Sequence, residues 1–325
     1  MRDNVFKLLY ALGVPSLLRM GKSAQITILS LHRISPERDV FFDPIDPIVF
    51  KQLLGYIKKH YEVISFNEIP LCQNKSKKPL LILSFDDGYY DFYEYALPVL
   101  RSHDLVSNHN IVNTCASFNT VIWTQRFNYL FSFAKNENVD LVIEIHGETY
   151  KRSDFQNNWL LFNLEMFKRF LKLPEIVRIE KIDNLENKYS VKASYRMMNW
   201  DEIYDCSNNN VEIGSHTYSH TVLSTVDDRS ILLKEIQGSK KEIEEKIKED
   251  VNVLALPNGQ TSALVDKLVQ ESGFNYLLYV DDKTNLVTDS IYKSKFQVYN
   301  RINLLNEKYA EMILRSELFH SKIRR

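Results

Sequence analysis

The chain has 325 residues, of which 44% are hydrophobic and 26% are charged, and its formal net charge is −1. These values are typical of a globular protein with one large core or two modest ones, and nothing in the near-neutral charge argues for a nucleic-acid-binding surface. The three cysteines have no paired spacing, which argues against a disulfide framework and favours a reducing compartment.

The first 22 residues are predicted to form a helix that packs on the domain. The segment is charged at Arg2, Asp3 and Lys7, its apolar stretch is broken, and it lacks the small-residue cleavage pattern of a secretory signal. No run in the chain approaches the ~20 apolar residues of a transmembrane helix. We therefore expect a cytoplasmic protein, with weak contact between the first helix and a membrane surface as an alternative.

The rest of the chain alternates between strand-like and helix-like patterns. Short apolar or β-branched runs predict strands at 25–31, 61–65, 80–85, 110–113, 211–213, 251–256, 276–280 and 297–302. Apolar residues at helical spacing predict helices at 47–57, 93–103, 232–248, 264–271 and 307–318. This alternation is typical of an α/β protein with a parallel sheet, open or closed.

Residues from about 123 to 198 break this rhythm, because they are rich in helix signals and poor in strand signals. We interpret the stretch as a helical insertion packed on the main domain, so that residues 1–325 form a single catalytic domain. The chain shows no internal repeat and no low-complexity tract that would suggest a solenoid or a linker.

The predicted strand at 80–85 leads directly into Asp86, Asp87 and Gly88. An unbroken apolar run is typical of a strand buried on both faces, and barrel enzymes place their chemistry at the carboxyl ends of such strands. Successive side chains on a strand point to opposite faces, so both carboxylates can serve one site only if the chain turns there. Gly88 permits that turn.

A second candidate site lies at His216 and His220, which follow another predicted strand. In a helix or a tight turn this spacing brings both rings to one side, as in many metal sites. Two histidines and one carboxylate would hold a catalytic metal with open positions, and the alternative is a pair of capping or surface histidines.

These motifs resemble those of the polysaccharide deacetylases, carbohydrate esterase family 4. The sequence SFDDG at 84–88 is similar to the first family motif, and HTYSH at 216–220 is similar to the second. The sequence ALPNG at 255–259 resembles the third motif imperfectly, because Ala255 stands where familiar members have an arginine that orients the base. The resemblance covers about 25–121 and 195–305, and it implies a distorted (β/α)7-type barrel that carries the helix-rich insertion.

The resemblance also implies the catalytic roles. Asp86 would be the general base, and Asp87, His216 and His220 would bind a divalent metal. Zinc suits two nitrogens and one oxygen best, and cobalt or nickel also fit. The water that attacks the acyl carbon would be activated beside this metal.

Three further assignments are less direct. The late segment in which many relatives carry the acid histidine has none here, so we assign the general acid to His32, as in circularly rearranged members, with a structural histidine as the alternative. Arg301, at the end of a late strand, is predicted to orient Asp86. Pro257 and Asn258 are predicted to contribute to substrate binding or to the orientation of the base.

The residues and the resemblance together predict a metal-dependent hydrolase that removes an N-acyl group, in the first instance acetyl, from an amino sugar. The carbohydrate substrate would be a polysaccharide, an oligosaccharide or a glycan precursor, such as an intracellular intermediate of a surface polysaccharide. Two alternatives stay open: a carbohydrate-binding barrel that has lost turnover, and an amide or ester hydrolase with a non-sugar substrate. The sequence does not indicate the oligomeric state.

Overall fold

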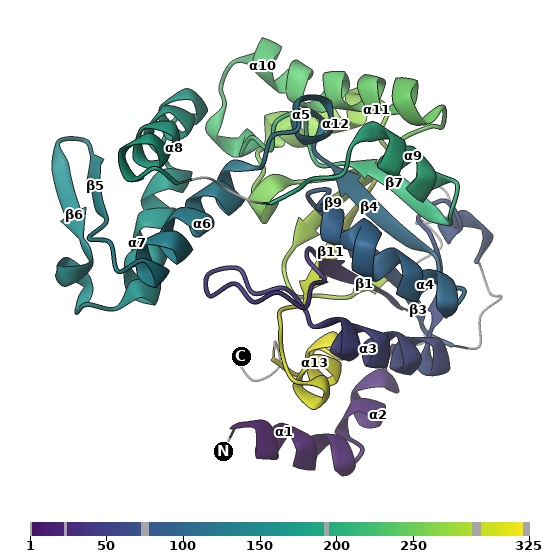
Figure 1. Cartoon of the computed structure of the whole chain (residues 1–325). Coiled ribbons are helices and arrows are strands. Elements are labelled where there is room, and N and C mark those ends of the chain that lie inside the picture. The colour runs from purple at the N-terminus through teal and green to yellow at the C-terminus, as the bar shows by residue number, and fades with distance from the viewer. Residues whose placement is uncertain (1, 23–24, 73–77, 192–194, 288–293, 321–325) are drawn as a thin grey trace.

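Figure 1 shows the fold as a computed structural model, which describes residues 2–22, 25–72, 78–191, 195–287 and 294–320. At its centre, seven parallel strands close into a barrel, in the order β1, β11, β9, β8, β7, β4, β3 and back to β1. These strands are β1 (Gln25–Leu31), β3 (Leu80–Phe85), β4 (Ser107–Ile111), β7 (Val211–Ser215), β8 (Val253–Ala255), β9 (Tyr276–Val280) and β11 (Gln297–Asn303). The predicted (β/α)7-type barrel is therefore confirmed.

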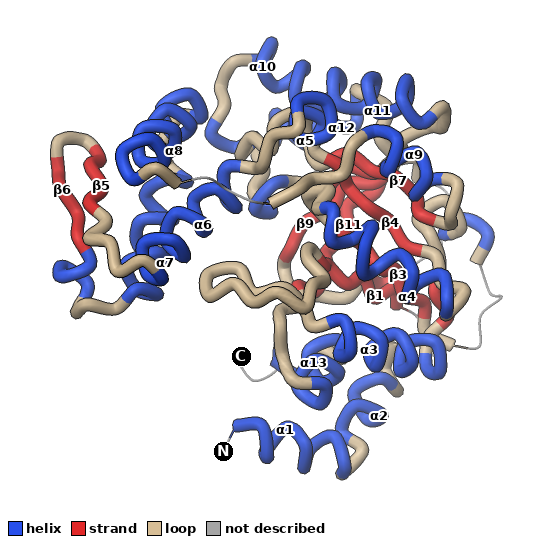
Figure 2. Tube along the Cα trace, in the orientation of Figure 1, coloured by secondary structure: helices blue, strands red, loops and turns tan. Residues whose placement is uncertain are grey.

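Two short strands extend the sheet: β2 (Glu62–Val63) pairs with β3, and β10 (Asn285–Leu286) pairs antiparallel with β1. Figure 2 shows helices around the outside of the barrel. They are α3 (Pro47–His60), α4 (Leu97–Ser102), α5 (Asn113–Phe118), α9 (Trp200–Ser207), α10 (Arg229–Leu233), α11 (Ser239–Ile247), α12 (Ala263–Glu271) and α13 (Tyr309–Ser316). Two π-helical segments precede α4 and α11, η2 (Phe92–Ala96) and η5 (Lys234–Gly238), and short 3-10 turns lie at η1 (Ile69–Leu71), η4 (Leu223–Thr225) and η6 (Pro257–Gly259).

In several barrel strands, neighbouring apolar residues belong to different cores. In β1, Ile26 and Ile28 pack with apolar residues of β3, β8, β9 and β11, whereas Leu29 and Leu31 pack in the cluster that includes the outer helices. All six residues of β3 are buried. A strand covered on both faces favours apolar residues, and every residue of β3 except Ser84 is apolar.

Several predicted elements differ in their bounds, and two of these differences have a clear physical reason. The helix predicted for residues 1–22 is two helices, α1 (Arg2–Ala11) and α2 (Val14–Arg19), because Gly13 between them has a φ of 78°. Strand β4 begins at Ser107 rather than at residue 110, because its first residues are polar although they are buried. Among the described residues, no helix has both the length and the apolar character needed to cross a membrane.

The stretch that breaks the strand–helix alternation contains α6 (Trp123–Asn136), α7 (Trp159–Leu171) and α8 (Glu175–Tyr189), with a 3-10 turn, η3 (Arg152–Phe155). It also contains a hairpin that the sequence did not predict, formed by β5 (Val142–Ile145) and β6 (Glu148–Lys151). This unit has its own apolar cluster, and Figure 2 shows its hairpin on the side that faces away from the barrel. Residues 192–194 of the predicted insertion lie outside the described part of the chain.

A buried carboxylate ties the N-terminal helices to the barrel. The side chain of Glu317, just after α13, is fully buried and lies 2.8 Å from Lys22 Nζ and 3.3 Å from Arg19 Nη1. It also accepts hydrogen bonds from the hydroxyl groups of Tyr56 and Tyr61, at 2.8 and 2.7 Å. One carboxylate thus joins α2, α3 and α13.

We predict that Glu317→Gln lowers the free energy of unfolding by about 3–5 kcal/mol, because it leaves the buried Lys22 ammonium without its carboxylate. Denaturant unfolding measures the change. The matched control is Glu271→Gln, which removes an exposed partner of Lys267 and should change stability by less than about 0.5 kcal/mol. Equal effects of the two substitutions would contradict the assigned role of Glu317.

Candidate active site

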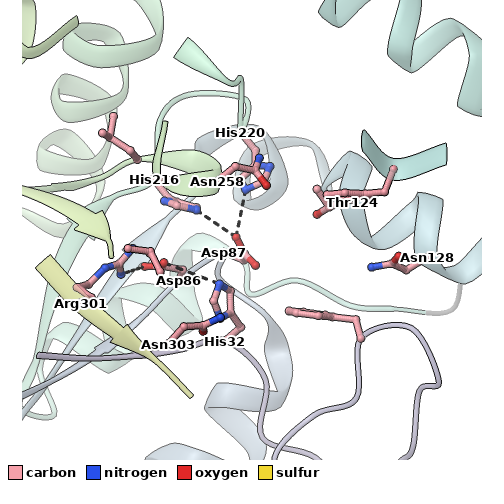
Figure 3. A pocket seen from close by; sticks show the side chains of 15 residues that line it. His32, Asp86, Asp87, Thr124, Asn128, His216, His220, Asn258, Arg301 and Asn303 are labelled. Atoms are coloured by element: carbon pink, nitrogen blue, oxygen red, sulfur yellow. Dashed lines mark hydrogen bonds and ion pairs between the residues drawn. The ribbon is translucent and has the colours of Figure 1, made fainter. Parts of the chain in front are cut away.

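Polar side chains converge at the carboxyl ends of the barrel strands (Figure 3). Asp86 follows β3, His32 follows β1, His216 follows β7, and Arg301 lies near the end of β11. These four residues line one cavity of about 320 Å³. Because the carboxyl ends of parallel strands share one rim of a barrel, closure of the sheet brings together residues that are distant in sequence.

The chain turns sharply at Asp87 and Gly88, whose φ angles are 78° and 86°. The Gly88 N–H donates to Nε2 of His109, at 3.2 Å. Burial lowers the pKa of His109 to about 4, so its ring is neutral and can accept this hydrogen bond. The turn lets Asp86 and Asp87, which are neighbours in sequence, face the same cavity.

Asp87, His216 and His220 form a compact set of candidate metal ligands. Asp87 Oδ1 lies 3.3 Å from His216 Nε2 and 3.4 Å from His220 Nε2, and all three side chains are buried. His216 Nδ1 contacts the carbonyl oxygen of Ala255 at 2.9 Å, so Nδ1 carries the proton and Nε2 presents its lone pair to Asp87. Among the described residues Asp87 Oδ1 has no hydrogen-bond partner. An orphaned carboxylate oxygen that faces two imidazole nitrogens fits a divalent metal.

The two histidines lie on a loop rather than on a helix, and both rings nevertheless fall on one side, with centroids 5.0 Å apart. Positive φ angles at Thr217 and His220 shape this loop. Glu235 fastens it, because its carboxylate accepts from the Ser219 N–H at 2.9 Å and its carbonyl accepts from the Tyr218 N–H at 3.1 Å.

A second group of potential ligands, Glu307, Glu311 and His320, has a different character. Glu307 forms an ion pair with Arg315, and Glu311 forms one with Arg2. These guanidinium groups already neutralise the carboxylates, so we assign no metal to this group.

Asp86 is buried beside the candidate metal site and has two donors on one oxygen. Arg301 Nη1 and Asn110 Nδ2 each lie 2.7 Å from Oδ1, whereas His32 Nε2 lies 3.9 Å from Oδ2. Burial alone would raise the pKa of Asp86, but the adjacent Arg301 guanidinium, together with His216 and His32, outweighs burial and holds this pKa below its ordinary value. Asp86 is therefore ionised at neutral pH, and Oδ2 is its less occupied oxygen.

Of the two residues predicted to bind substrate or orient the base, Asn258 and Pro257, only Asn258 lies in the cavity wall. Asn258 lines the cavity and has a φ of 56° within the turn η6. Pro257 is buried and does not line the cavity among the described residues.

Sequence reasoning missed several residues of the site. Asn110 and His109 lie in β4, where polar residues carry no strand signal, and Asn303 ends β11. Four more lining residues are Phe42, Thr124, Asn128 and Phe167, and three of these belong to the helix-rich insertion. No motif marks them, because their contribution depends on how the insertion packs against the barrel.

Comparisons with known proteins find similarity to polysaccharide deacetylases in part of the sequence and in the fold. Residues 180–277 match the family model described as polysaccharide deacetylase, and residues 112–206 match one described as a protein of unknown function (DUF1075). No curated protein matches the chain.

Solved structures resemble the whole chain at low sequence identity. The deacetylase PplD of Streptococcus pyogenes, in complex with acetate, is 16% identical, with 90% of this chain and 98% of that chain covered and a TM-score of 0.59. IcaB from Ammonifex degensii is 14% identical, with 91% and 98% covered and a TM-score of 0.59. A polysaccharide deacetylase from Bacillus cereus is 12% identical, with 90% and 69% covered and a TM-score of 0.56.

At such identities the solved structures establish the fold alone. The family-model match covers β7, the loop that carries His216 and His220, and β8. The match to the polysaccharide deacetylase model is confined to residues 180–277, and the barrel around it has the same fold as the solved deacetylase structures.

Gly214 of β7 is required by the packing around Asp86. A Cβ atom at this position would lie 2.1 Å from Oδ1 of Asn110, the residue that donates to Asp86. We predict that Gly214→Ala displaces the Asn110 side chain and lowers the free energy of unfolding by about 1–3 kcal/mol.

The control for this prediction is Gly55→Ala, in the exposed interior of α3, where no atom lies within 4 Å of the added Cβ. This change should stabilise the protein by about 0.5–1 kcal/mol, since alanine is the better helix former. Thermal unfolding of both variants provides the test, and a neutral or stabilising Gly214→Ala would show that the close approach carries no cost.

Proposed function

We propose that the chain is a metal-dependent deacetylase that hydrolyses an N-acyl group, in the first instance acetyl, on an amino sugar of a polysaccharide, oligosaccharide or glycan precursor. The observation that carries this proposal is the juxtaposition, in one cavity, of the ligand set Asp87, His216 and His220 with a separate ionised carboxylate, Asp86. Asp86 lies beside the candidate metal site but is paired with Arg301, so it can accept a proton instead of binding the metal.

Asp87, His216 and His220 would hold the metal, and two imidazoles with one carboxylate favour zinc, with cobalt or nickel as alternatives. When bound there, such a metal would supply a Lewis acid that polarises the acyl oxygen and makes the attacking water more acidic.

Asp86 acts as the general base in this proposal. Arg301 and Asn110 occupy Oδ1, so Oδ2 is the atom that takes the proton from the attacking water. Arg301 comes from β11 and supplies a cation to Asp86, although Ala255 stands where the familiar motif has arginine. This contact supports an active enzyme over a barrel that has lost turnover.

His32 acts as the general acid. Its Nε2 lies 3.9 Å from Asp86 Oδ2, and its side chain is 25% exposed on the cavity. A proton held at this nitrogen would pass to the departing amine as the carbon–nitrogen bond breaks. We further propose a cytoplasmic enzyme that acts on an intermediate of a surface polysaccharide, with α1 as the element that would touch a membrane surface.

We predict that a chelator abolishes release of acetate from an N-acetylated glycan, and that zinc, cobalt or nickel restores it. Asp87→Ala and His220→Ala should each lower the affinity for metal by at least about tenfold, because each removes one of three protein ligands. Metal content after dialysis, measured by elemental analysis, is the readout. Full activity in metal-free protein would refute the proposed dependence.

We predict that His32→Ala and Asp86→Asn each lower kcat by about 10²–10⁴, the usual contribution of a general acid or base, while metal stays bound. The control is His60→Ala, a histidine at the end of α3 that lies outside the cavity and should leave kcat within about twofold. Unchanged kcat in His32→Ala would remove this residue from the mechanism.

A further inference from the structure

The cavity has two chemically different walls. All of its ionisable lining side chains come from the barrel: His32, Asp86, Asp87, His216, His220 and Arg301. The opposite wall is built by the helix-rich insertion and is uncharged, with Thr124 and Asn128 of α6 and Phe167 of α7. We call these three residues the insertion wall.

The polar part of the insertion wall is directed into the cavity. Thr124 and Asn128 are four residues apart on α6, so they share one face of the helix. Asn128 is 8% exposed, and its Oδ1 accepts from Asn163 Nδ2 at 3.2 Å. Figure 3 shows the Asn128 side-chain nitrogen turned toward the cavity that Asp87 also faces. Asn163 therefore fixes the amide so that it offers a donor.

The apolar part is a ring held in place by stacking. Phe167 lies parallel to Trp123, with centroids 5.3 Å apart and an angle of 19° between the rings, and the edge of Phe127 supports it at 5.7 Å. The guanidinium of Arg178 lies 4.5 Å from the other ring of this stack, Trp123. The ring at the cavity is thus the last member of a stack that begins inside the insertion.

Arg178 anchors this stack to the end of α7. It is fully buried and donates to the carbonyl oxygens of Phe170 and Leu173, at 2.9 and 2.8 Å, at and just beyond the end of the helix. Phe167 cannot turn away without disturbing this buried arrangement. A surface fixed before the ligand arrives loses little entropy on binding.

We propose that the insertion wall is the sugar subsite and that it selects an uncharged N-acyl hexosamine, an inference that rests on the proposed deacetylase function. Phe167 packs against the C–H face of the sugar ring, and Asn128 Nδ2 donates to one of its hydroxyl oxygens. The N-acyl group then points to the barrel wall, where Asp86 and Asp87 lie. A sugar that carries a carboxylate or phosphate would bring its charge against a wall without a cation, which disfavours it.

The test compares substrates with and without a sugar. The probes are 4-nitrophenyl acetate, which engages the barrel wall alone, and pentamers of N-acetylglucosamine in β-1,4 and β-1,6 linkage. We expect Phe167→Leu and Asn128→Ala each to raise KM for a cleaved pentamer, and to raise it about tenfold more than they raise KM for the ester. A change of about tenfold is the effect expected when one contact in a binding pocket is lost. Leu164→Ala, on the exposed face of α7, is the matched control and should change neither value.

The possible outcomes separate this inference from the function on which it rests. If Phe167→Leu and Asn128→Ala change KM equally for the ester and the pentamer, or change neither value, the insertion wall does not recognise the sugar. Hydrolysis of the ester but of neither pentamer by the wild-type protein would also overturn it, while leaving a metal-dependent hydrolase. If no probe is hydrolysed by the metal-loaded protein, the proposed function itself fails.

The charge preference is tested by inhibition of ester hydrolysis in the wild-type protein. N-acetylglucosamine should inhibit at a concentration about tenfold lower than N-acetylglucosamine 6-phosphate, because the insertion wall offers no cation to the phosphate. Tighter inhibition by the phosphorylated sugar would contradict selection of an uncharged hexosamine.

Discussion

The architecture of the site depends on the pairing of β1 with both β3 and β11, which closes the barrel. Residues 26–31 of β1 pair in register with residues 80–85 of β3, and the Asp86 N–H continues this pairing by donating to the Leu31 carbonyl at 3.0 Å. His32 thereby follows the strand beside Asp86, and β11 delivers Arg301 from the other side. An open sheet with the same elements would separate these three residues.

The closed barrel buries several charged side chains at its rim, where apolar side chains would often make the protein equally or more stable. Asp86, Asp87, His216 and Arg301 are all nearly fully buried, and an apolar replacement of a buried ion pair is often neutral or stabilising by about 1–4 kcal/mol. Such an arrangement is expected where chemistry, rather than stability, determines the residues. The Arg301 contact keeps Asp86 ionised, and the turn at Asp87 directs the neighbouring carboxylate to the histidines.

The sequence predicted the elements whose patterns are local. The apolar run before Asp86 and the spacing of His216 and His220 required only neighbours in the chain. The alternation of strands and helices predicted a parallel sheet, open or closed, and only the family resemblance implied that it closes into a barrel. Strand β4 was misjudged at its start, and Asn110 was missed, because buried polar residues resemble a loop. The hairpin β5–β6 and the insertion wall were missed because residues such as Asn128 and Phe167 acquire a role only through packing between distant segments.

The most direct test of the central claim is anomalous diffraction from a crystal grown with zinc. The account predicts one strong peak at coordination distance, about 2.0–2.2 Å, from Asp87 Oδ1, His216 Nε2 and His220 Nε2, with Asp86 outside this shell and still paired to Arg301. A peak coordinated by Asp86, a peak only at Glu307, Glu311 and His320, or no peak at the barrel rim would contradict it.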